Sequence, residues 1–248
     1  MTKAAQAPWA AGPGEILRHG LELLKRDTDT NRRLAMISID NAVELTIKTY
    51  LGLPTRITGL KISRNEYQDF SESFPKLLDA LEKHASDKLN GVDLGDIEWY
   101  HRLRNQLYHQ GNGLTVERDK VEVYAELANA LFTNLFGFRL VQPEDDKTAL
   151  LGNFMIAWVN FEKVLAQAAA SLNIDTRGRP VMPLQITQIL EKEGYISRAE
   201  MVELTSLRET RNKIVHGVAN HQEALKPDTV KRLVTLTTEI EQRLQARP

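Results

Sequence analysis

Residues Leu207–Gly217 read Leu-Arg-Glu-Thr-Arg-Asn-Lys-Ile-Val-His-Gly, and a similar stretch, Tyr-His-Arg-Leu-Arg-Asn-Gln-Leu-Tyr-His-Gln-Gly, spans Tyr100–Gly111. Both carry Arg-Asn, then three residues, then His, and both predict the end of a helix at a nearby glycine. From the residue usage of this chain, about 0.02 copies of that spacing are expected by chance, so two copies indicate a repeat. We therefore interpret the chain as two scaffolds, each of which holds one Arg-Asn-x-x-x-His motif.

Composition favours a helical protein of ordinary charge. Of the 248 residues, 42% are hydrophobic and 26% are charged, and only 14 Gly and 9 Pro are present, which disfavours a turn-rich β fold. The net charge of −1 argues against a protein that coats nucleic acid non-specifically, although it permits a local basic groove. The absence of cysteine excludes disulfides and thiolate metal sites and fits a cytoplasmic location. No apolar run approaches the roughly 20 residues that span a bilayer, so no membrane partner is expected.

Apolar periodicity predicts helices along most of the chain. Residues 1–12 are expected to form a flexible arm, and Gln142–Asp146, with Pro143 and three acidic residues, is the best linker. The pattern weakens over Thr55–Phe70, which could hold a turn of helix or a short strand and is left irregular. The predicted helices of the first half cover about 15–25, 30–51, 73–90, 96–109 and 115–138, with Asp96 as a cap and Leu34 inside. Those of the second half cover about 148–172, 183–192, 197–216 and 227–246, with Ser197 and Glu200 as a capping box.

The spacing of the motif sets a geometric requirement. On a regular α-helix, an Arg and a His five residues apart point about 140° apart and lie about 7.5 Å apart along the axis. They converge on one substrate if the helix unwinds at the His, as Gly111 and Gly217 would permit, or if the two motifs face each other. A single basic cluster near a helix C-terminus is explained by capping and by the helix dipole. Two copies in equivalent helices favour a functional site.

Tandem motifs of this kind, at the helix ends of two four-helix halves, resemble the HEPN superfamily, whose signature is an Arg, four to six residues and then a His. The resemblance covers about Pro13–Ala246. It implies an all-α fold of two tandem four-helix HEPN-like bundles, residues 13–141 and 142–248, arranged as an intramolecular pseudo-dimer. For active members it implies a metal-independent ribonuclease that needs no cofactor and whose two motifs form one cleft.

The chemistry of the motif residues suits that reaction. A histidine can take the proton from a ribose 2′-hydroxyl, and an arginine can hold the scissile phosphate through bidentate bonds. RNA supplies its own nucleophile, so the expected products are a 2′,3′-cyclic phosphate and a 5′-hydroxyl. The asparagines would orient the histidine or the phosphate. The resemblance assigns Arg104, His109, Arg211 and His216 to catalysis, with Asn105 and Asn212 in support.

Further candidates lie beside the motifs. Arg102, Arg208 and Lys213 could line an RNA groove or be solvated surface residues, and Tyr108 could stack on a base or take a core or helix-packing position. No carboxylate or histidine pair has metal-ligand spacing, so no metal is expected. Among the other histidines, His101 is a candidate for the cleft, His221 is expected at the surface, and His19 and His84 are expected to lack partners.

The functional prediction is an endoribonuclease of a toxin or antiviral defence system. The alternative is a catalytically silent HEPN module that binds a nucleotide, RNA or a partner protein, and a purely structural scaffold is a third reading. An antitoxin, a sensor or another regulatory protein are the candidate partners besides RNA, and a homodimer is a further candidate. Some HEPN toxins carry, two residues after the His, a Tyr that a nucleotidyltransferase modifies. Gly111 and Val218 stand there in this chain, so that control is not expected.

Overall fold

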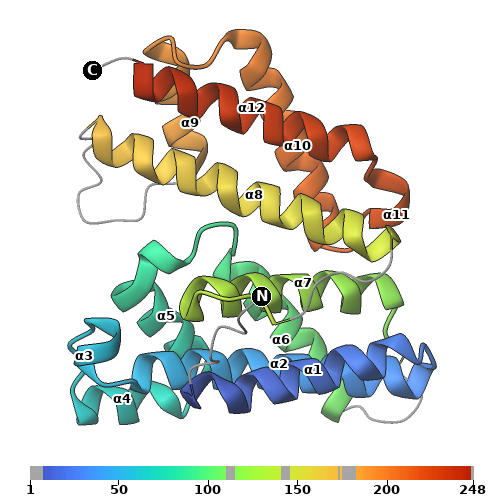
Figure 1. Ribbon diagram of the computed structural model, residues 1–248. Helices are drawn as coiled ribbons and strands as arrows, with labels where there is room; N and C mark the ends of the chain where they lie inside the picture. The colour runs from blue at the N-terminus through green and yellow to red at the C-terminus, as the bar shows by residue number, and fades with distance from the viewer. Residues whose placement is uncertain (1–7, 110–114, 141–145, 173, 175–182, 247–248) are drawn as a thin grey trace, which may run out of the picture. The chain divides into compact units, whose positions relative to one another are not determined.

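The computed structural model describes residues 8–109, 115–140, 146–172, 174 and 183–246. These residues form twelve α-helices and two short 3-10 helices with no strand among them, which confirms the predicted all-α class. The chain divides into two compact units, Met1–Gln142 and Pro143–Pro248, called the first and second units (Figure 1). Of the helices described, none is both long and apolar enough to cross a membrane.

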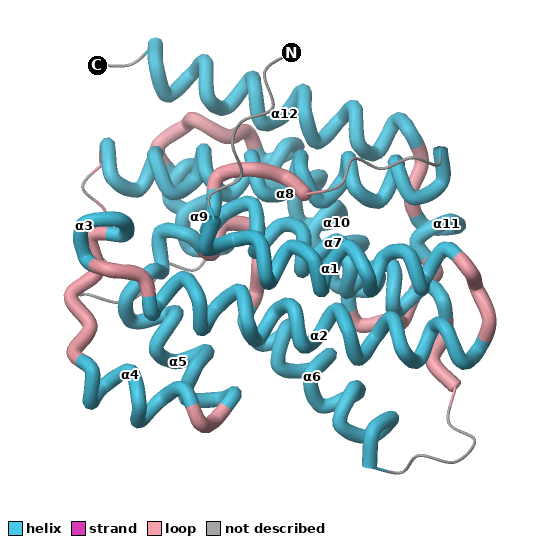
Figure 2. Tube along the Cα trace, turned by 60° about the horizontal axis from the view of Figure 1, so that its bottom comes forward, coloured by secondary structure: helices cyan, strands magenta, loops and turns pink. Residues whose placement is uncertain are grey.

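The first unit is organised around α2 (Asp29–Gly52), which contacts most of the other helices of the unit. Helix α1 (Ala11–Lys25) lies along α2, and α6 (Leu94–His109) crosses it (Figures 1 and 2). The Thr28 side chain caps α2 by accepting a hydrogen bond of 3.2 Å from the Asn31 N–H. The other elements of this unit are η1 (Pro8–Ala10), α3 (Thr55–Thr58), α4 (Arg64–Ser71), α5 (Phe74–Ala85), η2 (Ser86–Lys88) and α7 (Arg118–Phe136).

The second unit packs two long helices side by side, α8 (Asp146–Ser171) and α12 (Pro227–Ala246) (Figure 1). Between them in sequence come α9 (Pro183–Lys192), the motif helix α10 (Arg198–Val215) and the short α11 (His221–Ala224). A long helix, a shorter helix, the motif helix and a closing helix therefore follow one another in this unit. The first unit has the same order in α2, α5, α6 and α7.

The predicted N-terminal arm, residues 1–12, is too long. Pro8–Ala10 form a 3-10 turn that packs against α1 and α2, and its last residue is 1% exposed. Helix α1 then begins at Ala11, which places Pro13 in its first turn, where a proline is tolerated. Residues 1–7 and most of the predicted linker, Gln142–Asp146, lie outside the described residues.

The stretch Thr55–Phe70, which the sequence leaves irregular, contains α3 and most of α4. The Ser63 side chain starts α4 by accepting a hydrogen bond of 3.2 Å from the Glu66 N–H. This Ser-x-x-Glu pattern marks a helix start, but the helix that follows is too short for its apolar periodicity to be recognised. Leu34, predicted to lie inside α2, is 43% exposed.

Helix α6 begins earlier than the sequence suggests. Its cap is Asp93, whose Oδ1 accepts a hydrogen bond of 2.7 Å from the Gly95 N–H, and the predicted cap, Asp96, lies buried in the first turn. The preceding helix α5 ends at Ala85, five residues before the predicted stop.

The predicted capping box at the start of α10 is confirmed. Glu200 accepts hydrogen bonds from the Ser197 N–H and hydroxyl at 2.8 and 2.7 Å. Arg243 of α12 donates to the same carboxylate from both terminal nitrogens, at 3.0 and 2.7 Å. Arg243 and then Ser197 lower the pKa of Glu200 to about 2, so the carboxylate ties the motif helix to the closing helix.

Replacement of Glu200 by glutamine should cost about 1 to 2 kcal/mol of unfolding free energy at pH 7. Because the pKa of the folded state is depressed, the contribution is present above the usual value of 4.5 and is lost as the pH falls towards about 2. Urea unfolding at pH 7, 4.5 and 3 should show the gap between wild type and Glu200→Gln closing with acid. Glu209→Gln, on the exposed side of the same helix, is the control, and a gap that stays constant would contradict the assignment.

Candidate functional site

A buried carboxylate holds the first motif in place. Asp40 of α2 is 0% exposed and accepts hydrogen bonds from two other helices. From α6, Arg104 donates from Nε at 2.7 Å, and His101 donates from Nδ1 at 3.0 and 3.2 Å to the two carboxylate oxygens. From α7, the Tyr124 hydroxyl donates at 2.7 Å. Three donors therefore meet at one acid in the core.

The charges of this cluster are balanced. Asp40 and the part-buried Arg104 form an ion pair, because a fully buried carboxylate is stable only beside a cation and hydrogen-bond donors. Burial first, and then the negative charge of Asp40, raise the pKa of Tyr124 well above its ordinary range. The phenol therefore stays protonated and remains a donor. The ring of Tyr100 stacks on that of Tyr124, with centroids 4.6 Å apart.

Arg104 is oriented by bonds from each of its three nitrogens. Besides Nε, its Nη1 donates to Asn105 Oδ1 at 2.9 Å and its Nη2 donates to Asn41 Oδ1 at 3.1 Å. These bonds use three of the five N–H groups of a guanidinium, so one N–H on each terminal nitrogen takes part in none of the three. With 16% of the Arg104 side chain exposed and its Nη2 bond to Asn41 at the surface, the guanidinium reaches the solvent edge of the cluster.

The first motif is helical up to its last residue, His109. Helix α6 continues through His109, so the backbone does not unwind before that residue. Arg104 and His109 therefore project about 140° apart by helix geometry. The His109 side chain and Gly111 lie outside the described residues.

The second motif has the same Arg-to-Asn bond in a different setting. Arg211 Nη1 donates to Asn212 Oδ1 at 3.4 Å, a longer contact than in the first motif. Arg211 is 5% exposed, so its guanidinium is more deeply covered than that of Arg104. Both motifs thus hold their arginine through the following asparagine.

Helix α10 ends at the motif histidine, as the sequence predicts. His216 is the C-cap, and Gly217 follows with a left-handed φ of 64°. The Gly217 N–H donates to the Ile214 carbonyl at 3.0 Å and the Val218 N–H donates to the Lys213 carbonyl at 2.8 Å, which is the Schellman pattern. The turn leaves His216 exposed at the helix end.

The residues proposed for RNA binding are mostly at the surface. Arg102 is 70% exposed and donates to Glu98 at 2.5 Å, and Tyr108 is 63% exposed, so it is not a core residue. Lys213 is exposed, whereas Arg208 is half-buried.

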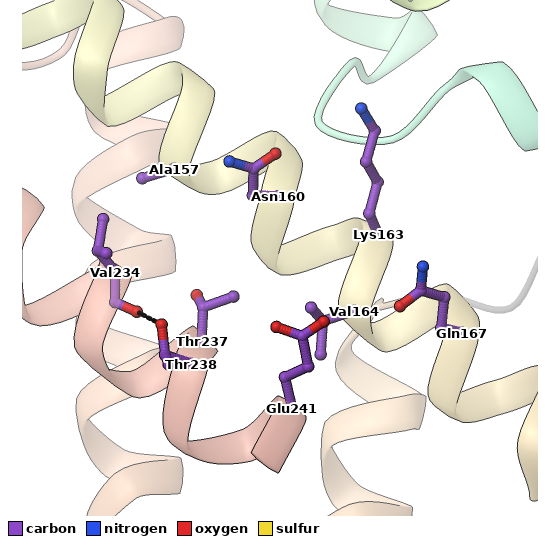
Figure 3. Close-up of a pocket in the computed structure, with 9 residues that line it drawn as sticks. All are labelled: Ala157, Asn160, Lys163, Val164, Gln167, Val234, Thr237, Thr238 and Glu241. Carbon is purple, nitrogen blue, oxygen red and sulfur yellow. Dashed lines mark hydrogen bonds between the residues drawn. The ribbon is translucent and has the colours of Figure 1, made fainter. Parts of the chain in front are cut away.

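A pocket of about 300 Å³ lies between α8 and α12 of the second unit (Figure 3). Thr237 and Thr238 donate their hydroxyls to the Leu233 and Val234 carbonyls, so towards the pocket they act as acceptors. None of its described lining residues belongs to either motif. They are Ala157, Asn160, Lys163, Val164, Gln167, Val234, Thr237, Thr238 and Glu241.

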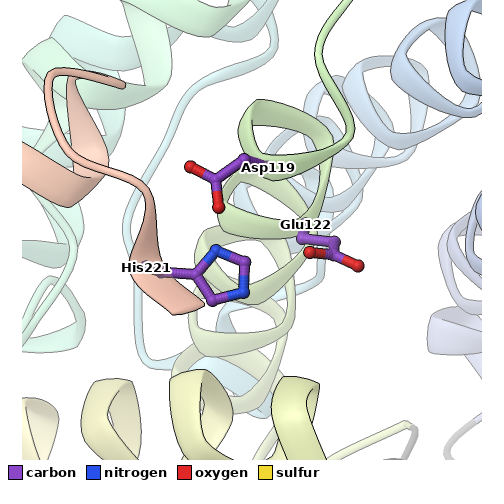
Figure 4. A group of neighbouring side chains, drawn as sticks. All are labelled: Asp119, Glu122 and His221. Carbon is purple, nitrogen blue, oxygen red and sulfur yellow. The ribbon is translucent and has the colours of Figure 1, made fainter. Parts of the chain in front are cut away.

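Two carboxylates, Asp119 and Glu122, lie one turn apart at the start of α7 (Figure 4). Glu122 accepts a hydrogen bond of 2.6 Å from Arg118 Nε. His221, drawn with them, belongs to α11 of the second unit, so neither unit alone holds all three groups and we assign no metal site. His221 is 1% exposed, contrary to its expected surface position.

Asp40 was not predicted as a site residue, although its position in the sequence carries a signal of its role. It shares the apolar face of α2 with Met36, Val43 and Ile47, all at helical spacing and all buried. A lone acid on such a face requires a partner of opposite charge, here Arg104, which lies 64 residues later in the chain. His84, expected to lack a partner, also has one.

No family model, curated protein or solved structure matches this chain. The likeness to the HEPN superfamily therefore remains an expectation drawn from the two motifs. The chemistry of the site has to follow from its own residues.

Removal of the Asp40 charge should destabilise the fold strongly. Asp40→Asn leaves the Arg104 cation without its buried partner, so a loss of about 3 kcal/mol is expected. Tyr124→Phe removes one neutral donor and should cost about 1 kcal/mol. Urea unfolding of both variants checks this order, and equal losses would show that the carboxylate is not the central acceptor.

Proposed function

We propose that this chain is a metal-independent endoribonuclease of a toxin or antiviral defence system, in which both Arg-Asn-x-x-x-His motifs are needed. The observation that carries the proposal is the repeated motif, in which an arginine is bound by the following asparagine in both units.

The proposed reaction uses groups that the motifs supply. Arg104 and Arg211 bind the scissile phosphate and the charge that grows on it. His109 and His216 supply proton transfer, including the proton that the leaving 5′-oxygen receives. Bonding of the ribose oxygen to phosphorus gives a 2′,3′-cyclic phosphate and a 5′-hydroxyl. Magnesium has no step in this sequence.

The asparagines support the arginines in this proposal. Asn105 and Asn212 each accept a hydrogen bond from the preceding arginine, which favours a role in orienting the guanidinium over one in orienting the histidine. The exposed position of His216 at the end of α10 suits proton exchange with a bound substrate.

The burial of Arg211 favours a second candidate, a catalytically silent module that binds a nucleotide, RNA or a partner protein. An arginine that is 5% exposed has little surface to offer a phosphate. In that case the second motif stabilises its unit, and the first motif alone contacts the ligand.

The proposal is tested by incubating purified chain with single-stranded RNA in EDTA. Cleavage to a cyclic phosphate is expected, and Arg104→Ala should slow it by about 100-fold or more through loss of charge stabilisation. His216→Ala should slow it by about 100- to 10,000-fold through loss of proton transfer.

Arg198→Ala, which removes an 81% exposed arginine bound to Glu191 in the second unit, is the matched control and should keep full activity. Circular dichroism and thermal melts establish that each variant is folded. Tight RNA or nucleotide binding without cleavage would support the silent module instead. Activity that survives in either motif variant would contradict a requirement for both motifs.

A further inference from the structure

Helix α6 places a histidine closer to Arg104 than His109 is. His101 precedes Arg104 by three residues, so on this helix the two project about 60° apart and about 4.5 Å apart along the axis. The corresponding values for Arg104 and His109 are about 140° and 7.5 Å. Both His101 and Arg104 bind Asp40, so they share one side of α6.

The His101 ring is fixed in position and in tautomer. Its Nδ1 binds Asp40, and its face stacks on Phe74 with centroids 3.8 Å apart and ring planes 9° apart. The Asp40 carboxylate is paired with Arg104 and can only accept, so Nδ1 carries the hydrogen. In the neutral ring, Nε2 then holds the lone pair.

The Nε2 atom is placed to receive a proton from outside the cluster. Among the described residues, the side-chain hydrogen bonds of His101 run through Nδ1. About 15% of its side chain is exposed, almost the same fraction as for Arg104. An imidazole that is oriented by a carboxylate and adjoins a guanidinium has the arrangement of a general base beside an anion-binding group.

We propose that His101, oriented by Asp40, is the general base that acts on the ribose beside the phosphate held by Arg104. This inference rests on the proposed ribonuclease function. Nε2 takes the proton of the 2′-hydroxyl, the 2′-oxygen forms a bond to phosphorus, and the bond from phosphorus to the 5′-oxygen breaks. The 5′-oxygen receives a proton from a motif histidine, and solvent restores both histidines to their starting states.

The second unit does not repeat this dyad. Alignment of Arg104 with Arg211 sets Arg208 against His101, and alignment of Glu44 with Glu162 sets Trp158 against Asp40. Trp158 and Arg208 both line one small cavity of about 20 Å³, so the two aligned positions are neighbours in this unit as well. The base therefore belongs to the first unit alone, which leaves His109 or His216 as the acid.

The first test compares His101→Gln with His84→Gln. His84 is a matched control, because it is also 15% exposed in the first unit and also binds a carboxylate, Glu66, at 2.9 Å. His101→Gln should lower kcat for RNA by about 100-fold or more with little change in KM, whereas His84→Gln should retain kcat within about twofold. Full activity of a folded His101→Gln variant would overturn the proposal.

A substrate with sulfur in place of the leaving 5′-oxygen distinguishes base from acid. A thiolate leaves without protonation, so a variant that lacks the acid regains cleavage, whereas a variant that lacks the base does not. His101→Gln should stay slow on this substrate, and either His109→Ala or His216→Ala should recover. Recovery of His101→Gln would assign it as the acid and refute the proposed role.

Absence of RNA cleavage by the wild-type chain would refute the ribonuclease function separately. In that case ¹⁵N NMR of His101, with and without a 2′-O-methyl RNA, decides the inference. A resonance of Nε2 that shifts with RNA, while Nδ1 keeps its hydrogen, would retain His101 as a ligand-facing group. An unchanged Nε2 resonance, or a hydrogen on Nε2 instead of Nδ1, would refute it.

Discussion

The ion pair between Asp40 and Arg104 is the interaction on which the first unit depends. A carboxylate that is 0% exposed must be compensated by charge and by hydrogen bonds, so it draws side chains from α6 and α7 onto α2. Those side chains include the arginine of the first motif. The interaction that satisfies the core therefore also fixes the guanidinium at the solvent edge. Stability and site geometry cannot be varied independently here.

The two motifs share a sequence but not an environment. In the first unit the arginine is held by an acid and two asparagines, at the edge of a polar cluster. In the second unit Trp158 stands where alignment expects the acid, and Arg211 is more deeply buried. The Schellman turn after α10 exposes His216 at the helix end. Such differences favour different roles for the two motifs over two equivalent copies.

Local signals in the sequence were enough for the longer helices and for the existence of the motifs. The bounds of α9 and α12 and the capping box at Ser197 follow from proline, cap residues and apolar spacing, all of which act within a few residues. The environment of the motif arginine could not be predicted this way, because Asp40 reaches Arg104 across 64 residues. In a periodicity analysis an aspartate counts only as a polar position, whereas in the structure Asp40 is a buried hydrogen-bond acceptor. Helix α4 was missed since its Ser63 cap precedes only eight helical residues.

The most direct test of this account is a crystal structure of the chain bound to a 2′-O-methyl RNA that cannot be cleaved. The account predicts a phosphate oxygen within about 3 Å of an Arg104 terminal nitrogen, with Asp40 still bound to Nε. It also predicts that the modified ribose oxygen of the same nucleotide faces His101 Nε2. RNA bound away from Arg104, for example in the pocket between α8 and α12, would contradict it.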